Sequence, residues 1–122
     1  MNPMQHDPKG RITLQKTAAR IRILAGDTVI VDSRDAVELR ETDYPPRFYL
    51  PREDIAMDRL QESKTATHCP FKGDATYYNL LLEDRTIADA AWSYEEPYAD
   101  MMAIRGHLAF ASSELMEDIG ED

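Results

Sequence analysis

Residues 67–77 form the stretch in which reactive side chains lie closest together in the sequence. They include His68, Lys72 and Cys69, the only cysteine of the chain. An imidazole can carry protons, a thiolate can act as a nucleophile, and an ammonium group can stabilise a developing negative charge. Because neighbouring side chains in an extended segment point to opposite faces, His68 and Cys69 are not expected to form a catalytic dyad.

Each of these residues therefore has two interpretations. Cys69 is either a small apolar residue of a binding pocket or core, or a nucleophile whose base comes from elsewhere in the fold. His68 is either a hydrogen-bonded pocket or core residue, or a proton carrier. Lys72 is predicted to stabilise an anion electrostatically.

A second stretch, residues 49–54, contains Arg52 and Asp54 directly after a proline. An arginine can bind a carboxylate or phosphate through two parallel hydrogen bonds, whereas a lysine acts as a point charge. If Arg52 and Lys72 converge, they form a local anion site, and Asp54 is a possible acid or base beside it. The alternative is that Arg52 pairs with neighbouring acids and Lys72 with Asp74, as surface ion pairs that contribute little.

Four aromatic residues near these stretches complete the predicted pocket: Tyr49, Tyr77, Trp92 and Tyr94. Tyrosine and tryptophan combine a large apolar body with a polar tip, so they give a pocket both surface and orientation. The alternative is that the same side chains belong to the core.

The sequence predicts neither a metal nor a cofactor, although Asp54, His68, Cys69 and His107 could in principle supply metal ligands. One cysteine cannot form an internal disulfide, and no C-x-x-C or H-E-x-x-H spacing is present among the cysteine and histidines. The glycine patterns of phosphate-binding loops, G-x-x-x-x-G-K-[ST] and G-x-G-x-x-G, are also absent. We therefore predict that the site works with its own side chains.

Composition limits the classes of partner. The formal net charge is −9, which disfavours binding to phosphate backbones or anionic lipid surfaces, so neither nucleic acid nor membrane is an expected partner. No apolar run approaches the roughly 18 residues of a spanning helix, and the first residues lack the apolar core of a secretory signal. We expect a cytoplasmic protein, and the sequence does not determine its oligomeric state.

Short alternating segments predict a mainly β fold built from antiparallel strands, with one or two short helices. A glycine-first turn at residues 26–27 connects two β-branched runs, which predicts a hairpin. The longest strand-like run, residues 74–82, is apolar on both faces near its end and is expected to be central. Strands are expected near residues 20–24, 28–31, 37–39, 47–50, 63–68, 74–82, 86–92 and 107–110. Helical turns are expected after Pro51 and over residues 98–105.

The chain length predicts one domain. We expect a flexible N-terminal arm over residues 1–19, a single β domain over residues 20–111, and an acidic C-terminal tail over residues 112–122. The tail carries a dense group of acidic residues and is expected to be frayed or to form a short solvated helix.

Residues 49–54, 67–77 and 91–94 together resemble the family catalogued as domain of unknown function 427, from about residue 20 to about residue 110. The resemblance implies a fold similar to the β-tent of methionine sulfoxide reductase B, in which two antiparallel sheets meet at an angle. β-tent proteins often carry a four-cysteine zinc site, which this chain cannot form. A nucleotidyltransferase label has been attached to the family, but no nucleotide-binding motif accompanies it here.

The sequence thus predicts a pocket for a small anionic or polar metabolite. Its expected residues are Arg52, Asp54, His68, Lys72, Trp92 and Tyr94, with Tyr49, Cys69 and Tyr77 beside them. Both binding alone and turnover remain open; in an enzyme, Asp54 or His68 carries the proton. The alternative is a non-catalytic interaction module that binds a partner through a sheet edge or through the helix containing Met101 and Met102.

Overall fold

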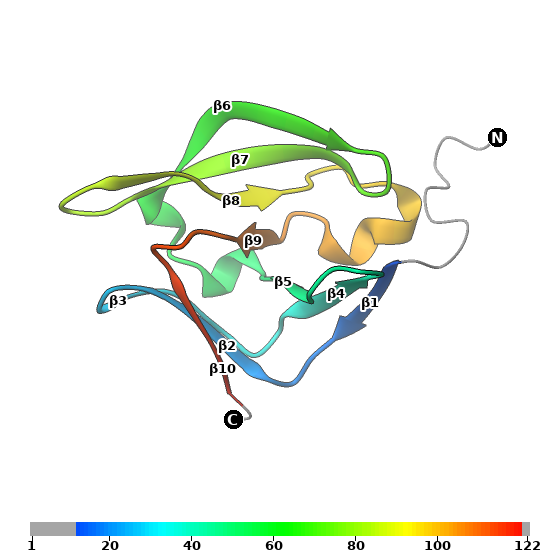
Figure 1. Cartoon of the computed structure of the whole chain (residues 1–122), viewed down its shortest axis with the longest axis horizontal. Coiled ribbons are helices and arrows are strands. Elements are labelled where there is room, and N and C mark those ends of the chain that lie inside the picture. The colour runs from blue at the N-terminus through cyan, green and yellow to red at the C-terminus, as the bar shows by residue number, and fades with distance from the viewer. Residues whose placement is uncertain (1–11, 121–122) are drawn as a thin grey trace.

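The computed structural model describes residues 12–120, which fold into three antiparallel sheets (Figure 1). A four-stranded sheet has the order β6 (Leu60–Cys69), β7 (Gly73–Leu81), β8 (Thr86–Ser93), β9 (Leu108–Phe110). One three-stranded sheet has the order β1 (Ile12–Lys16), β4 (Val37–Glu41), β5 (Arg47–Tyr49). The other has the order β10 (Met116–Gly120), β2 (Arg20–Ala25), β3 (Thr28–Ser33). The prediction of a mainly β, antiparallel fold is confirmed.

The predicted hairpin is present as β2 and β3, joined at Gly26 and Asp27. Gly26 has a φ of +60°, which a glycine adopts without the steric cost of a side chain. Alternation along β2 buries Ile21 and Ile23, as the period-2 pattern predicts. The central position predicted for residues 74–82 also holds, because β7 pairs with β6 on one side and β8 on the other.

Two strands lie where the sequence predicted an arm and a tail. In β1, Ile12 is buried and the strand pairs with β4, so the expected arm over residues 1–19 is wrong for this part. In β10, Ile119 pairs with Ile21 of β2, so the expected acidic tail is wrong for residues 116–120. An edge strand can keep acidic side chains in solvent while its backbone pairs on one side. The acidic sequence of residues 116–120 is therefore compatible with a strand as well as with a solvated tail. Residues 1–11 and 121–122 lie outside the described part.

The helical turns are all of the 3-10 type: η1 (Arg52–Asp54), η2 (Met57–Arg59) and η3 (Ala99–Ile104). η3 consists of two short turns that meet at Met101, whose backbone is not helical, and its buried residues are Met101 and Ile104. The expected face of Met101 together with Met102 is therefore wrong, and Met102 is exposed. Gly106, with a φ of +72°, ends the segment as predicted.

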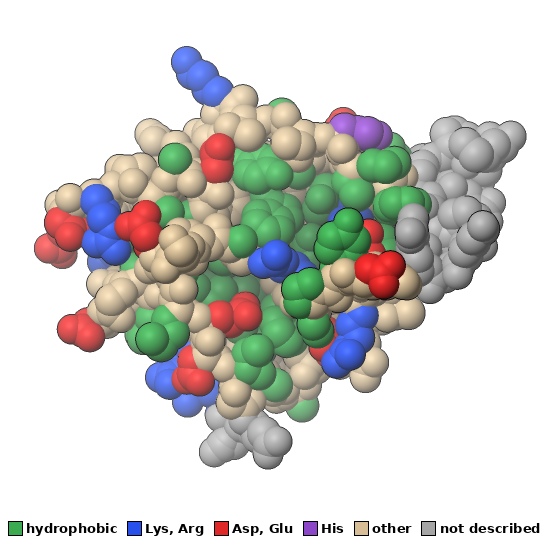
Figure 2. All heavy atoms as spheres, viewed as in Figure 1, with side chains coloured by type: hydrophobic (Ala, Val, Ile, Leu, Met, Phe, Trp, Pro, Cys, Tyr) green, Lys and Arg blue, Asp and Glu red, His purple; other side chains and the backbone are tan. Residues whose placement is uncertain are grey.

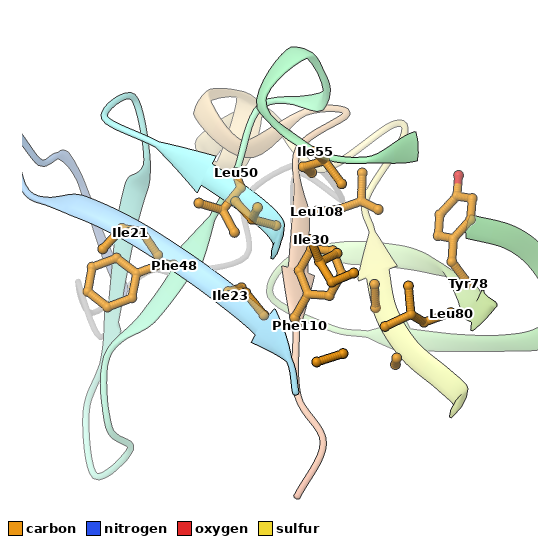
Figure 3. Packing of buried hydrophobic residues seen from close by; sticks show 14 of the residues in the cluster. Ile21, Ile23, Ile30, Phe48, Leu50, Ile55, Tyr78, Leu80, Leu108 and Phe110 are labelled. Carbon is orange, nitrogen blue, oxygen red and sulfur yellow. The ribbon is translucent and has the colours of Figure 1, made fainter. Parts of the chain in front are cut away.

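Two apolar clusters fill the interior. The first packs the β2–β3 hairpin against the four-stranded sheet, and Figure 3 shows Ile23 and Ile30 grouped with Leu108 and Phe110. The second lies on the other face of the sheets and includes Tyr49, Tyr94 and Met101 among its members. Strand alternation explains the division, because Phe48 belongs to the first cluster and the next residue, Tyr49, to the second.

A backbone junction joins two of the sheets. The amide of Leu50 donates to the carbonyl of Leu108 at 2.8 Å, and the amide of Leu108 donates back to the carbonyl of Leu50 at 2.9 Å. Strand β5 therefore continues the four-stranded sheet beyond β9, as their adjacent positions in Figure 1 show. Because of this junction, one continuous curved sheet face extends from β7 through β8, β9 and β5 to β4. The candidate site lies on this face.

Candidate ligand-binding site

A hollow of about 390 Å³ lies on this curved face. Alternate residues of β4 and β5 line it in pairs, and Trp92 of β8 with Tyr94 just after that strand forms a third pair, which is the spacing of side chains that share one face of a sheet. The turn between β4 and β5 and the turn before β7 close its sides. We call it the aromatic hollow; its lining is Leu39, Glu41, Tyr44, Pro45, Arg47, Tyr49, Lys72, Tyr77, Trp92 and Tyr94.

Lys72 is held in place at the wall of the aromatic hollow. Its ammonium lies 3.3 Å from a carboxylate oxygen of Glu41, and the two side chains are only 13% and 17% exposed. The same ammonium lies 3.8 Å from the sulfur of Cys69. Its backbone is fixed as well, because Gly73 has a φ of +122° and packs against the backbone of residues 96 and 97.

Arg47 supplies the second cation of the aromatic hollow. Its guanidinium carbon lies 5.0 Å from the centroid of the Trp92 ring, within the range of a cation–π contact. One of its nitrogens donates to the carbonyl of Phe110 at 3.1 Å. Figure 2 shows one face of the molecule on which hydrophobic side chains gather around a central basic side chain.

The aromatic side chains of the hollow contact one another. The indole nitrogen of Trp92 donates to the hydroxyl oxygen of Tyr49 at 3.2 Å, across β9, which lies between β8 and β5. The ring of Tyr77 lies 6.2 Å from that of Trp92, and the ring of Tyr94 lies 6.3 Å from that of Tyr49. The result is a continuous aromatic surface with its polar tips in defined places.

Burial raises the pKa of the two inner phenols above the ordinary value of a tyrosine, which already leaves the hydroxyl protonated at neutral pH. Burial raises the pKa of Tyr49 to about 12, although the hydrogen bond from Trp92 lowers it somewhat. Burial also raises the pKa of Tyr94 well above its ordinary value, and nearby Tyr49, Cys69, Tyr77 and Glu41 raise it further. At neutral pH both hydroxyls are therefore available as hydrogen-bond donors.

Arg52 does not converge with Lys72. Its side chain donates to the carbonyl of Gly106 at 2.7 Å and pairs with Glu95, beside Tyr78. Tyr78 and Tyr77 are neighbours on β7 and point to opposite faces, so Arg52 and the aromatic hollow lie on opposite sides of that strand. The predicted convergence of the two cations is therefore wrong.

A separate hollow of about 460 Å³ contains Arg52, with Lys16, Asp35, Pro51, Glu53, Arg105, Gly106 and His107 as the rest of its lining.

The alternative pairings expected for the two cations are wrong as well. Arg52 pairs with Glu95 instead of its sequence neighbours, and Lys72 pairs with Glu41 instead of Asp74.

Asp54 and His68 also lie away from the aromatic hollow. Asp54 accepts a hydrogen bond from the hydroxyl of Ser33 at 2.7 Å, which anchors η1 to the end of β3. His68 is exposed on β6, with its Nδ1 atom 2.7 Å from Asp74 and its Nε2 atom 3.3 Å from the hydroxyl of Tyr98. His68 and Cys69 do diverge, since Cys69 packs against the second apolar cluster.

Of the nine residues predicted for the site, the structure thus places five in the lining of the aromatic hollow and Cys69 next to it. The five are Tyr49, Lys72, Tyr77, Trp92 and Tyr94. Sequence reasoning missed Leu39, Glu41, Tyr44, Pro45 and Arg47. The alternation over residues 37–40 and 47–50 placed Leu39 and Arg47 on strand faces, but which face meets Trp92 depends on the junction between β5 and β9. Tyr44 and Pro45 lie in the turn between β4 and β5, for which the sequence carries no site signal.

Within residues 12–120, no three histidine, cysteine, aspartate or glutamate side chains gather in an arrangement that could hold a metal ion. In the same part of the chain, no helix is both long enough and apolar enough to cross a membrane.

These features define a class: an antiparallel β domain whose curved sheet face carries a hollow lined by aromatic side chains and two cations. The chain belongs to the family described as a domain of unknown function (DUF427), which it matches over residues 13–121. The resemblance read from the sequence is confirmed, and the match extends over β10 and nearly all of β1. No curated protein matches the chain.

Proposed function

We propose that this domain binds a small anionic or polar metabolite in the aromatic hollow. The observation that carries the proposal is the presence of Arg47 and Lys72 in one aromatic-lined hollow of a chain whose net charge is −9. In an acidic protein, a local positive site attracts anions while the rest of the surface repels them. We propose that this binding takes place in the cytoplasm.

The size of the hollow supports a metabolite over an inorganic ion. Small-molecule sites usually measure about 300–1,000 Å³, and the aromatic hollow, at about 390 Å³, lies within that range. Its lining also resembles that of such sites in combining aromatic side chains with a few fixed polar groups.

An enzymatic form of the proposal uses Lys72 as the electrostatic stabiliser. Asp54 and His68 lie outside the hollow, so the carboxylate next to the ammonium, Glu41, is the group placed to carry a proton. Turnover would be detected by NMR as product signals that appear when the metabolite is incubated with the protein. Glu41→Gln should abolish those signals without removing binding.

Binding is tested by thermal shift against carboxylates, sugar phosphates and nucleotides, with the unaltered protein, Arg47→Ala and Lys72→Gln. A ligand at about a hundred times its Kd should add roughly 2.7 kcal/mol, which is several degrees for a domain of this size. We expect at least one anion class to stabilise the unaltered protein and to lose most of that effect in both variants.

Two matched variants serve as controls. Arg40→Ala removes a cation from the other face of β4, and Lys64→Ala removes an exposed lysine from β6. Both should retain the full ligand shift. The proposal is refuted if no anion class shifts the unaltered protein, or if the control variants lose the shift as fully as the hollow variants do.

A second candidate function is a non-catalytic interaction module. It is favoured by β6, a ten-residue strand at the edge of its sheet, and by the exposed side chain of Met102. An unpaired strand edge can bind an extended segment of a partner. Gel filtration over a range of concentrations, alone and with the stabilising anion, separates the two functions, because a module would assemble without responding to a small ligand.

A further inference from the structure

The lining of the aromatic hollow offers more hydrogen-bond donors than acceptors. The hydroxyl of Tyr94, whose residue is only 6% exposed, has no hydrogen-bond partner within residues 12–120. The hydroxyl oxygen of Tyr49 already accepts from Trp92, so its own proton is left for a different acceptor. One carboxylate oxygen of Glu41 accepts from Lys72. Acceptor oxygens on a bound molecule would therefore suit the hydroxyl protons of Tyr94 and Tyr49 and the remaining N–H groups of Lys72.

The charge of the lining limits the charge of that molecule. Arg47 and Lys72 are opposed by Glu41, so the lining carries one net positive charge. A monoanion balances this charge, whereas a phosphate ester carries about 1.5 to 2 negative charges at pH 7. Excess charge in a half-buried site is costly because it has lost water without gaining a partner. The balance favours a carboxylate over a phosphate.

The rest of the lining of the hollow is largely aromatic. Trp92 and Tyr77 present tilted rings, and the turn between β4 and β5 adds Tyr44 and Pro45. Aromatic faces gain most from another planar group, through stacked or edge-to-face contacts. An aliphatic body of the same size would fill the space without those contacts.

We propose that the aromatic hollow binds an aromatic monocarboxylate. Its carboxylate accepts hydrogen bonds from the Tyr94 hydroxyl and the Lys72 ammonium, and its ring packs against Trp92 and Tyr77. This inference rests on the proposed function and names the ligand class of the same site.

The probe for this proposal is benzoate, titrated into the full chain. Trp92 is the only tryptophan, so its fluorescence reports on the hollow directly, and calorimetry gives the stoichiometry. We expect benzoate to bind one to one and to change the fluorescence. Benzamide lacks the charge and should bind at least roughly tenfold more weakly. Cyclohexanecarboxylate lacks the planar ring and should bind roughly two- to tenfold more weakly.

Tyr94→Phe removes only the hydroxyl and should weaken benzoate binding roughly ten- to a hundredfold, as expected for a buried hydrogen bond to a charged group. Tyr78→Phe is the matched control, because its hydroxyl lies on the opposite face of β7. It should change the affinity less than about twofold. If Tyr94→Phe does not fold, Lys72→Gln gives the same test of where the carboxylate binds.

Three results would overturn the assignment: benzoate that does not bind, benzoate that binds Tyr94→Phe as tightly as the unaltered protein, or phenyl phosphate that binds more tightly than benzoate. The third result, if it depends on Arg47 and Lys72, replaces the carboxylate by a phosphate and leaves the proposed anion pocket standing. The pocket itself fails only if the wider anion screen also gives no stabilisation that depends on these two cations.

Discussion

At the scale of single residues, the buried phenol of Tyr49 couples the hollow to the stability of the domain. Its hydroxyl joins β5 to Trp92 of β8, and burial raises its pKa from an ordinary value of 10.0 to about 12. Above about pH 10 the unfolded chain loses this proton, while the folded chain keeps it until about pH 12. The unfolded state therefore binds fewer protons in this window, and stability falls as the pH rises through it.

Tyr49→Phe should remove this part of the alkaline destabilisation. A pKa shift of about two units in Tyr49 corresponds to about 2.7 kcal/mol of stability. The difference in free energy of unfolding between the unaltered protein and the variant should therefore decrease by roughly 2 kcal/mol between pH 9 and pH 11.5. Urea unfolding at each pH measures it. Tyr44→Phe, which alters an exposed tyrosine, should follow the unaltered protein throughout. Parallel pH profiles for Tyr49→Phe and the unaltered protein would contradict the buried, protonated phenol.

At the scale of elements, β10 is an acidic edge strand that covers the edge of β2. It pairs along its whole length with β2, and Asp118 forms a 2.6 Å ion pair with Arg22. Beneath this pairing lie Ile21 and Ile23, which are fully buried in the first apolar cluster. The strand thus protects the β2–β3 hairpin, which contributes several buried residues to the first apolar cluster.

A chain ending after Leu115 should therefore be less stable by at least roughly 2 kcal/mol, because it loses the β10 ladder. A chain ending after Gly120 keeps the ladder and is the control. Urea unfolding measures both, and hydrogen exchange should show that the amides of β2 lose protection in the shorter chain only. Equal stability of the two chains would mean that β10 behaves as the solvated tail expected from its charges.

At the scale of the whole molecule, Arg52 ties separate parts of the fold together. It lies on η1, donates to the carbonyl of Gly106 before β9, and pairs with Glu95 after β8. A guanidinium can satisfy several acceptors at once, which suits a residue placed where three segments meet. These contacts indicate that Arg52 has a structural role, on the other side of β7 from Lys72.

Arg52→Ala should lower the free energy of unfolding by about 1–3 kcal/mol, because acceptors of a charged donor lose their partner. Arg40→Ala, which removes an exposed arginine, should change it by less than about 0.5 kcal/mol. The anion that stabilises the unaltered protein should bind Arg52→Ala with unchanged affinity. If Arg52→Ala lost anion binding while its stability stayed unchanged, Arg52 would belong to the binding site, as the sequence predicted.

The sequence by itself determined the local structure and the family. Period-2 alternation and glycine turns identified the β2–β3 hairpin, β7 and β8, because these signals depend on residues close together in the chain. Residues 49–54, 67–77 and 91–94 also identified the family, and five of the predicted residues line one hollow. Alternation further separated His68 from Cys69.

Only the tertiary structure decided which faces meet. The pair of hydrogen bonds between Leu50 and Leu108 joins β5 to β9 and brings Arg47 over Trp92, forty-five positions later in the chain. The same alternation that placed Tyr77 in the hollow put Tyr78, and Arg52 with it, on the other side of β7. Strand pairing is a long-range choice made by burial across sheets, so residue types near Arg52 and Lys72 could not reveal that the two cations lie apart.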